Sequence, residues 1–598
     1  MRSTITGLLL ATTMLTTQPH LRAADTTPGK IVSVADYGAI PGDGKDDGPA
    51  IVAAATAAAE AGATLVFPKG VYDIFEDTLP PTKRCVDIAD TDGMVIEGNG
   101  STLIGHGHIS TFWFMRCKNV TVRNFTIDWQ RPPFSQGKVL SSDARTITVQ
   151  VDPQYLISGQ ERLQGMMDYD PATHAPIGLI DAFESGIVKK RLLRPQVLEV
   201  TFKKDLAAPP PPGTLIVLRH EIYGWNAMEF IDCAKVTVED VTVHCSPGMA
   251  FHTATSRDLT LRRFRIAPTP DSGRLMSCTA DGLFFSSCTG TVTIDDSWIE
   301  ANGDDGINVS AKNLTVKDVP GPSELTAFAQ VGWAGIVPQP GDKVEIASVA
   351  DLVPKMTATV ASASYDKQAK VHRIKFDAPL PQPVKAGDVI VDVTQVAKLR
   401  VTNTTITKNR ARGIIVSTWD VAIDRCHISE QTMNGVLITS SPNRFGSQGP
   451  GANGLSITNC AFGGTFGSAI LAYVECPNPA PGVHRNVTIA GNTFTTEPAL
   501  DALRQKSQQP EVLCFQSAIY LGETDGATID GNVFNGYGIA AFLGASKNVK
   551  LADNRSTGDS AVVVDQGSVA PTLSGNTCLA VSDKPAAWTF AYLQPGQR

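Results

Sequence analysis

The segment ATIDGNVF (Ala527–Phe534) is followed 22 residues later by VKLADNRS (Val549–Ser556) and, after another 22 residues, by PTLSGNTC (Pro571–Cys578). Each copy has a short stretch of alternating apolar and polar residues, then a turn rich in Asn, Asp or Gly, then a second short stretch. Alternation is typical of a half-buried β-strand, and a short fixed period is typical of a solenoid. The unit has room for three short strands and no helix.

The same unit recurs toward the N-terminus. Further copies are VTVRNFTI from Val120, VTVEDVTV from Val236, LTLRRFRI from Leu259, VTIDDSWI from Val292, LRVTNTTI from Leu399, VAIDRCHI from Val421, LSITNCAF from Leu455 and VTIAGNTF from Val487. Stacked units of this kind pair their strands in parallel with the next coil. The sequence therefore predicts an all-β fold, a right-handed parallel β-helix. Within ATIDGNVF we expect Ile529 and Val533 to point inward, with Asp530 and Asn532 in the turn.

An open solenoid end exposes sheet edges, so a cap is expected. The Ala-rich segment after Asp47 predicts a capping helix with Asp47 as its N-cap and Gly62 as its stop. Two stretches, 131–225 and 311–398, interrupt the repeat with Pro-rich turns and alternating strands, and predict inserted β-subdomains. The coils then occupy residues 24–130 with the cap, 226–310 with the acidic residues described below, and 399–598.

The first 23 residues predict a secretory signal peptide. Arg2 precedes an apolar stretch from Gly7 to Leu15, and the small residues Ala23 and Ala24 follow. This is the pattern of a cleaved leader, and the apolar stretch is too short to span a membrane as a helix. No other run is long and apolar enough to do so. We expect a secreted or periplasmic protein without a membrane span.

Composition narrows the choice of partners. The formal net charge is -8, and 18% of residues are charged against 42% hydrophobic, which excludes a disordered chain. No stripe of Lys and Arg favours nucleic acid, so we expect none as a partner and favour a neutral substrate. The eleven cysteines form no CxxC and no zinc spacing. We expect mostly small core residues, with one or two disulfides as the alternative, and no metal or other cofactor.

Two segments with one pattern carry the acidic residues of interest. CTADGLFF contains Asp281, ANGDDGINV contains Asp304 and Asp305, and in both an Asp-Gly precedes an apolar–variable–apolar stretch. Aligning the patterns places Asp281 beside Asp305 on adjacent coils, about 4.8 Å apart, with Asp304 next to them. Carboxylates this close raise the pKa of at least one member. Glycoside hydrolysis needs a protonated carboxyl for the leaving oxygen and a carboxylate to activate water or attack.

A purely structural origin for these residues is the alternative. Asp-Gly and Gly-Asp-Asp are common turn sequences. The chain also contains Asp46-Asp47, which we assign to the cap, and Asp295-Asp296, which we assign to a solvated strand end. Asp304 and Asp305 differ from these pairs because a third acid, Asp281, is expected beside them on the preceding coil.

The acidic segments resemble those of the polygalacturonase-type β-helix hydrolases, which carry Asp-Gly on one coil and Gly-Asp-Asp on the next. Those enzymes also have Gly-His-Gly and Arg-Ile-Lys after the acids. Here GHG, at 105–107, precedes the acids, and RIK, at 373–375, lies inside an insertion. Because no basic pair is positioned for a uronate, pectin hydrolysis is disfavoured.

A fuller resemblance covers most of the mature chain. It is carried by FTIDWQRPPFSQG (Phe125–Gly137), LRHE (Leu218–Glu221), SPGMAF (Ser246–Phe251), SGRLMSCTADG (Ser272–Gly282), NGDDGINV (Asn302–Val309) and NRARGIIVST (Asn409–Thr418). These segments resemble glycoside hydrolase family 110, exo-acting α-galactosidases that cleave terminal α-1,3-linked galactose with inversion. The resemblance implies a β-helix interrupted by two β-barrel subdomains, in agreement with the two insertions.

The resemblance also implies that Asp281, Asp304 and Asp305 are the catalytic residues. By analogy with related β-helix hydrolases, Asp304 is the general acid, and Asp281 and Asp305 activate water. This chain has Phe284 and Ser310 where members of the family have His. That difference leaves the sugar preference open.

Sugar hydroxyls need planar polar groups and an aromatic platform. The candidates are Asp128, Trp129 and Arg131 at the exit to the first insertion, His220 and Glu221 at its return, His252 one coil before Asp281, and Arg274, Asn308 and Arg412. For the exit and return residues, an ion pair that stabilises the insertion is an equal alternative, and a lone His is often structural. Arg274 and Arg412 alternatively hold the aspartates ionised.

The sequence thus predicts an exported, metal-independent, inverting α-galactosidase for terminal α-1,3-linked galactose on glycans, either blood-group B-like or linear. Three alternatives remain at this level: another β-helix glycosidase, a β-helix polysaccharide lyase whose Ca²⁺ the three aspartates bind, and a glycan-binding solenoid without turnover. The exposed β-subdomains also favour a homodimer.

Overall fold

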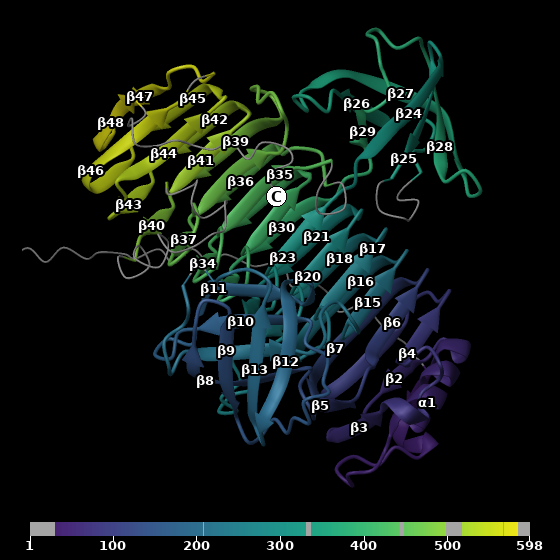
Figure 1. Cartoon of the computed structure of the whole chain (residues 1–598). Coiled ribbons are helices and arrows are strands. Elements are labelled where there is room, and N and C mark those ends of the chain that lie inside the picture. The colour runs from purple at the N-terminus through teal and green to yellow at the C-terminus, as the bar shows by residue number, and fades with distance from the viewer. Residues whose placement is uncertain are drawn as a thin grey trace, which may run out of the picture.

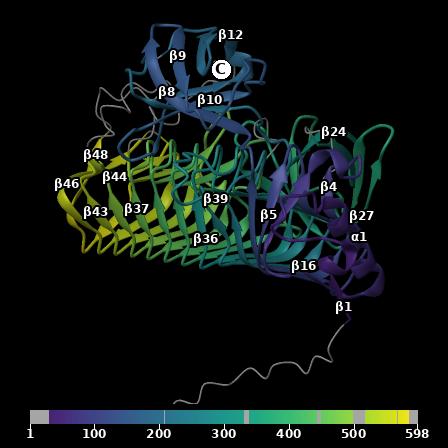
Figure 2. The same cartoon turned by 90° about the horizontal axis from the view of Figure 1, so that it is seen from below.

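The computed structural model describes residues 30–206, 208–329, 337–442, 448–497, 517–565 and 567–583. The expected signal peptide and Cys514 lie outside these residues. Within them, 35 strands form one continuous sheet wound into a parallel β-helix, and two antiparallel subdomains are inserted into it (Figure 1). In the view turned by 90° about the horizontal axis, the rungs stack in a row and the first insertion projects from one side of the β-helix (Figure 2). The predicted fold class is confirmed.

Each rung contributes strands to three columns, in which every strand pairs in parallel with its counterpart on the next rung. The first column contains β1 (Ile31–Ser33), β2 (Thr64–Val66), β5 (Val95–His106), β7 (Lys118–Trp129), β16 (Ala234–Val243), β18 (Arg257–Arg262), β21 (Thr289–Asp295), β30 (Lys398–Thr402), β33 (Trp419–Asp424), β36 (Asn453–Thr458), β39 (His484–Ala490), β42 (Thr524–Asp530), β45 (Lys547–Ala552) and β47 (Thr572–Ser574).

The long strands β5, β7 and β16 bend through the turn and continue into the second column. Its other members are β3 (Val71–Phe75), β19 (Arg265–Ile266), β22 (Trp298–Glu300), β31 (Thr405–Thr407), β34 (His427–Ser429), β37 (Ala461–Gly463), β40 (Thr493–Thr495), β43 (Val533–Asn535) and the first residues of β46 (Arg555–Val564), which continues into the third column. The third column contains β4 (Arg84–Ala89), β6 (Ser110–Met115), β15 (Met228–Ile231), β17 (Phe251–Ala254), β20 (Leu283–Ser286), β23 (Ile307–Ser310), β32 (Ile414–Ser417), β35 (Val436–Ser440), β38 (Ile470–Val474), β41 (Ile519–Gly522), β44 (Ile539–Gly544), β46 (Arg555–Val564) and β48 (Thr577–Asp583).

The turn between the first two columns explains the composition of the repeat. Its central residue has a positive φ in every copy, for example 51° at Asn403, 55° at Asn459 and 61° at Gly531. Gly, Asn and Asp adopt this left-handed conformation at the least cost, which is why they recur at this position. Arg263 and Arg425 adopt it as well.

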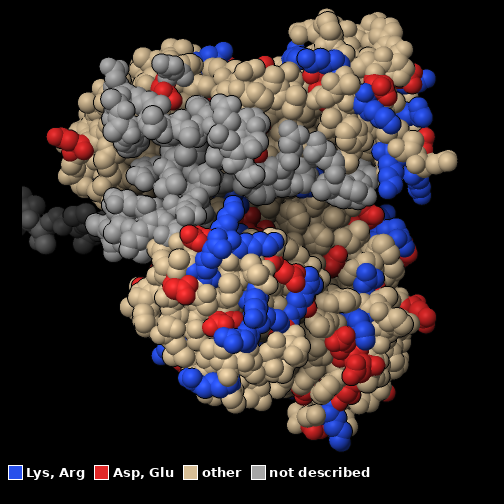
Figure 3. Space-filling model, in the orientation of Figure 1, with Lys and Arg blue, Asp and Glu red and all other residues tan. Residues whose placement is uncertain are grey.

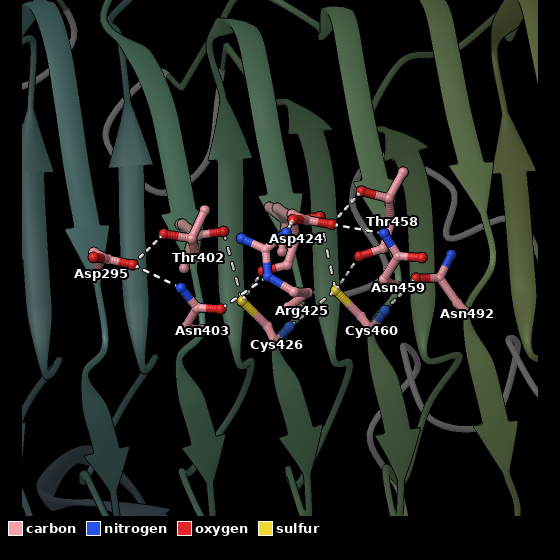
Figure 4. A network of polar contacts seen from close by, with 12 residues as sticks. Asp295, Thr402, Asn403, Asp424, Arg425, Cys426, Thr458, Asn459, Cys460 and Asn492 are labelled. Atoms are coloured by element: carbon pink, nitrogen blue, oxygen red, sulfur yellow. Dashed lines mark hydrogen bonds and ion pairs between the residues drawn. The ribbon is translucent and has the colours of Figure 1, made fainter. Parts of the chain in front are cut away.

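The residue after this turn points inward and forms a ladder along the β-helix. The Asn492 and Asn532 side chains are fully buried, and the backbone N–H of Asn492 donates to Oδ1 of Asn532 at 2.9 Å. Cys426 and Cys460 continue the same ladder (Figure 4). The expectation for Val533 is therefore wrong: Asn532 and Phe534 are buried, and Val533 is only half-buried.

The N-terminal cap is the helix α1 (Gly48–Ala61), which buries Ile51, Ala54, Ala55 and Ala58 against the first rungs. Gly62 ends the helix in a left-handed conformation, as expected. Asp47 is the N-cap residue, but its carboxylate accepts from the backbone N–H of Ile40 at 2.8 Å instead of capping the helix. Three short 3₁₀ turns, Val34–Tyr37, Glu76–Thr78 and Glu184–Gly186, lie elsewhere in the described residues.

The two insertions fold as separate antiparallel sheets. The first leaves after β7 and orders its strands β11-β10-β14-β8-β9-β13-β12. They are β8 (Phe134–Ser142), β9 (Thr146–Val151), β10 (Gly165–Tyr169), β11 (Pro176–Phe183), β12 (Ile187–Arg194), β13 (Val197–Phe202) and β14 (Leu215–Arg219). The second leaves after β23 and closes into a six-stranded barrel. It contains β24 (Leu314–Gly321), β25 (Glu324–Phe328), β26 (Lys343–Ala347), β27 (Pro354–Asp366), β28 (Val371–Phe376) and β29 (Val389–Asp392).

The cysteines behave as small core residues. All ten that the structure describes are free, and eight of them are buried. Cys476 is half-buried and Cys578 is exposed. The disulfides considered as an alternative are thus not formed among the described residues.

Candidate active site

Asp281 and Asp305 occupy equivalent positions on adjacent rungs. Each stands two residues before a third-column strand, and Leu283 of β20 pairs with Ile307 of β23. The N–H of Gly282 donates to the carbonyl of Asp305 at 2.9 Å, which fixes this register at the acids themselves. Parallel strands lie about 4.8 Å apart, so the two side chains are close neighbours. Asp304 is the residue before Asp305 in the chain and therefore lies one position away from this stacked pair.

The glycine after each acid has a packing role. A Cβ on Gly282 would lie 2.7 Å from the carbonyl oxygen of Gly306, and a Cβ on Gly306 would lie 2.7 Å from that of Gly413. Rungs this close admit only glycine at these places. The positions just before the stacked glycines form the pre-glycine column, which contains Asp281, Asp305, Arg412 and Asn434. The Asp-Gly motif therefore combines a structural glycine with a variable side chain.

Two arginines and one tyrosine contact the acids. Nη1 of Arg410 lies 2.7 Å from Oδ1 of Asp304, and the Tyr223 hydroxyl donates to Oδ2 of the same carboxylate. Asp305 accepts a hydrogen bond from the backbone N–H of Arg412 at 3.0 Å, and the Arg412 guanidinium lies 3.7 Å away. Both oxygens of Asp304 thus act as acceptors.

Burial and mutual repulsion shift the protonation of the acids. Asp281, Asp304 and Asp305 are 5%, 7% and 5% exposed. Burial, followed by the charges of Asp304 and Asp305, raises the pKa of Asp281 well above its ordinary value. Burial raises the pKa of Asp305 to about 7, although Arg412 opposes the shift. A protonated carboxyl is therefore available in this cluster near neutral pH, as acid catalysis needs.

The first insertion reaches this cluster through Asp181 on β11. Its carboxylate receives Nε of Arg410 at 2.8 Å and Nη2 at 3.0 Å, in a bidentate pair. Burial opposes ionisation of Asp181, but Arg410 and the nearby arginines lower its pKa overall. Arg410 is thereby shared between Asp181 and Asp304. Burial would lower the pKa of Arg410, but the two carboxylates raise it well above its ordinary value.

Arg219, at the end of β14, lies beneath the two acidic turns. Its side chain is fully buried, and its Nη1 donates to the carbonyls of Thr279, at 3.3 Å, and Gly303, at 2.8 Å. These carbonyls precede Asp281 and Asp304 by two and one residues. One guanidinium thus connects the backbones of both acid-bearing turns to the first insertion. Its Nε and Nη2 have no hydrogen-bond partner in the part of the chain that the structure describes.

The third-column strands extend the site along the outward face. His252, Phe284 and Asn308 are in register on β17, β20 and β23. The His252 and Phe284 rings stack at 5.6 Å, and Lys312 Nζ lies 5.7 Å from the Phe284 ring centre. Burial lowers the pKa of Lys312 to about 8. The buried Oδ1 of Asn308 has no hydrogen-bond partner among the described residues.

Three predicted sugar contacts form a separate cluster with its own partners. Nη1 of Arg274 lies 2.6 Å from Oδ1 of Asp128, and Thr269 donates to the other carboxylate oxygen at 3.0 Å. The Trp129 ring is 2% exposed, and its N–H donates to the carbonyl of Gly107 at 3.0 Å. The structure therefore favours the stabilising ion pair for Asp128 and Arg274, and Trp129 has no open ring face for a sugar.

The remaining exit and return residues also have protein partners. Arg131 donates to the carbonyls of Pro132 and Phe134 at 2.7 and 2.6 Å. The His220 ring contacts the Ser135 hydroxyl and the Arg162 carbonyl, both at 2.8 Å, and burial lowers its pKa to about 4. Glu221 pairs with His108 at 3.3 Å. These contacts stabilise the base of the first insertion, the alternative that the sequence left open.

Sequence reasoning missed several residues that surround the acids: Tyr223, Arg219, Asp181, Lys312 and Arg410. Two of them lie in segments that carried the resemblance, because Arg219 belongs to LRHE and Arg410 to NRARG. The others had no comparable signal. Of the predicted contacts, Asn308, Arg412 and His252 do lie on the same rungs as the acids or on the next one.

The described residues contain neither a metal-binding cluster of side chains nor a membrane-spanning helix. No group of three His, Cys, Asp or Glu side chains is arranged to hold a metal ion within the described ranges. No helix in those ranges is both long and apolar enough to cross a membrane. On the face drawn in Figure 3, acidic and basic side chains both appear on the first insertion.

Fold and site together define a parallel β-helix with a buried acidic cluster on adjacent rungs, and comparisons with known proteins agree with the β-helix fold. Residues 385–555 match the family described as "Right handed beta helix region". The chain is similar to alpha-1,3-galactosidase B of Bacteroides thetaiotaomicron, with 26% identity over 78% of this chain and 82% of that protein. It is 25% identical to alpha-1,3-galactosidase A of Bacteroides fragilis over 86% and 93%, and 26% identical to that of Streptomyces avermitilis over 82% and 87%.

Proposed function

We propose that this protein is an exported, exo-acting, inverting α-galactosidase that releases terminal α-1,3-linked galactose from glycans. The observation that carries the proposal is the buried cluster of Asp281, Asp304 and Asp305, which retains a proton near neutral pH. The similarity to curated alpha-1,3-galactosidases over most of the chain supports the choice of sugar and linkage.

The contacts of the acids support different roles within the cluster. Asp281 and Asp305 occupy adjacent positions of the pre-glycine column, where two carboxyls can hold a water between them. Asp304 instead contacts Tyr223 and the Arg410–Asp181 pair, on the side of the first insertion. We assign the activation of water to Asp281 and Asp305, and protonation of the departing oxygen to Asp304. An inverting reaction needs this division, with acid and base on opposite faces of the sugar ring.

In the resting arrangement Asp304 accepts from both Arg410 and Tyr223, whereas the carboxyls with a raised pKa are Asp281 and Asp305. A proton must therefore pass from Asp281 or Asp305 to Asp304 before the bond breaks, which leaves a carboxylate on that side to activate water. Arg412 pairs with Asp305 and so favours its ionised form, the carboxylate that activates the attacking water.

The first test measures galactose release from α-1,3-, α-1,4- and α-1,6-linked galactobiosides, with NMR detection of the first anomer released. We expect preferential cleavage of the α-1,3 linkage and β-galactose as the first product. α-Galactose as the first product would exclude inversion, and an unsaturated product absorbing in the ultraviolet would instead indicate a lyase.

The second test separates the acid from the water-activating residues. Asp304→Asn should lose about 10²- to 10⁴-fold in kcat on a disaccharide, but remain within about tenfold of wild type on an aryl galactoside whose leaving group needs no proton. Asp281→Asn and Asp305→Asn should be inactive on both substrates. Selective survival of Asp281→Asn on the aryl substrate would move the acid role to Asp281.

A further inference from the structure

Tyr223 combines an exposed ring with a hydroxyl fixed at the active site. It lies in the loop from β14 to β15, where the chain returns from the first insertion. Half of the residue is exposed, at 50%, while its hydroxyl donates to Oδ2 of Asp304. Desolvation of that hydroxyl, with the charges of Asp304 and Asp281, raises its pKa well above the ordinary value, so it remains a donor.

The backbone around Tyr223 holds the ring in place. Tyr223 has a φ of 55°, a left-handed conformation that a bulky residue adopts only when its surroundings impose it. The N–H of Ile222 donates to the Gln164 side chain at 2.9 Å, and that of Gly224 donates to the Pro247 carbonyl at 3.2 Å. Unlike Asn403 and Asn459, Tyr223 does not lie at a repeated rung turn. The loop therefore presents this side chain in a fixed orientation.

Two other aromatic rings near the acids have cations against them. The Phe284 ring lies beneath Lys312 and stacks on His252. The Phe183 ring has Arg219 at 5.2 Å and Arg410 at 5.0 Å from its centre. Tyr223 is half exposed and contacts Asp304 through its hydroxyl, so its ring is available beside that acid.

Galactose has a matching surface. Its axial 4-hydroxyl points to one face of the pyranose, and the C–H groups at C3, C4 and C5, with C6, form an apolar patch on the other. Such a patch packs against an aromatic ring, whose polar tip remains available for a hydrogen bond. We propose that Tyr223 is the binding platform for the apolar face of the terminal galactosyl ring and places its glycosidic oxygen within reach of Asp304. This inference rests on the function proposed above.

Two substitutions separate the ring from the hydroxyl. Tyr223→Ala removes the ring, and we expect it to weaken the binding of free galactose, measured by calorimetry on the full chain, about tenfold. Tyr223→Phe keeps the ring, and we expect its Kd for galactose to remain within about twofold of wild type while kcat falls because Asp304 loses one donor. Tyr37→Ala is the matched control, because Tyr37 is 43% exposed in the N-terminal cap, and its galactose Kd should not change.

The outcomes test the binding role of Tyr223 separately from the proposed galactosidase activity. Equal galactose binding by wild type and Tyr223→Ala would overturn the platform and leave the galactosidase in place. Equal losses of kcat in Tyr223→Ala and Tyr223→Phe, with unchanged galactose Kd, would show that Tyr223 only positions Asp304. A wild type that neither binds galactose nor releases it would refute the proposed function itself.

Discussion

Both insertions are antiparallel β-subdomains, but within the described residues only the first contributes strand residues to the contacts around the acidic cluster. The second begins at Leu314, a few residues after β23 and much closer in sequence to Asp305 than Arg219 is to Asp281. The first nevertheless contributes Asp181 and Arg219 to the site, and its return loop contributes Tyr223. Distance along the chain therefore does not decide which insertion shapes the chemistry.

The barrel packs against a later part of the β-helix. Leu352 and Val389 of the second insertion cluster with Val474 and Val483 beside β38 and β39. Nη2 of Arg485, on β39, lies 3.0 Å from the carboxylate of Glu345, on β26. These contacts are of the same kinds as those of the first insertion, but they end several rungs away from the acids. The comparison teaches that the site depends on which rungs an insertion covers.

The largest expected effect comes from cutting the link between the first insertion and the acidic turns. Arg219→Met leaves the carbonyls of Thr279 and Gly303 without this donor. We expect the free energy of unfolding to fall by about 3 kcal/mol, because two buried carbonyls lose their donor, and kcat/KM to fall about 100-fold, because the turns that carry both acids change position. Denaturant unfolding and steady-state kinetics measure the two effects.

Arg485→Met is the matched control in the barrel contact. It also removes a guanidinium that connects an insertion to the β-helix, in this case by pairing with the carboxylate of Glu345. We expect a smaller loss of stability and a kcat/KM within about twofold of wild type. If both variants lose activity to the same degree, the distinction between the two insertions fails.

A smaller effect is expected from Asp181→Asn, which keeps the shape of the side chain but weakens its bidentate pair with Arg410. Arg410 then holds Asp304 less accurately, and we expect kcat to fall about tenfold with little change in the Kd for galactose. Asp388→Asn is the control, since this buried barrel carboxylate pairs with Lys355 at 3.2 Å. Its kcat should equal that of wild type, and a loss of kcat there would contradict the assignment.

The smallest effect concerns a pair of acids inside the barrel. Burial, with the charge of Asp342, raises the pKa of Asp392 to about 7. A pKa raised in the folded state adds stability below the unfolded pKa near 4, and this stability is lost as the pH rises through about 7. Asp392→Asn mimics the protonated form, so its Tm should exceed that of wild type by about 1 °C at pH 8 and match it near pH 4. A difference independent of pH would show that the substitution acts through packing.

The rungs could be predicted because each one obeys local rules. The alternation of apolar residues, the left-handed turn residue and the fixed spacing all recur in the sequence, and a pattern repeated this often identifies the fold. The position of Asp281 beside Asp305 followed from the same repetition. The inward position predicted for Val533 is wrong because it assumes that the strand alternation continues unchanged through the turn. The turn shifts the alternation by one residue, so Phe534 points inward instead.

The surroundings of the acids could not be predicted in the same way. Asp181 and Arg219 reach the site because an antiparallel sheet folds back over two rungs, and no period in the sequence encodes that approach. Asp128 and Arg274 illustrate the converse. Both belong to segments with a specific resemblance, yet they pair with each other at 2.6 Å in the interior.

The stacked glycines have a consequence for how such proteins diversify. Gly282, Gly306, Gly413 and Gly435 each leave no space for a side chain, so the backbone in front of them has one shape on four successive rungs. The residues mounted there are nonetheless an acid, an acid, a cation and an amide. A single substitution in this row exchanges one reactive group for another on an unchanged support. New specificities can therefore evolve at these four positions without a change in the backbone of the β-helix.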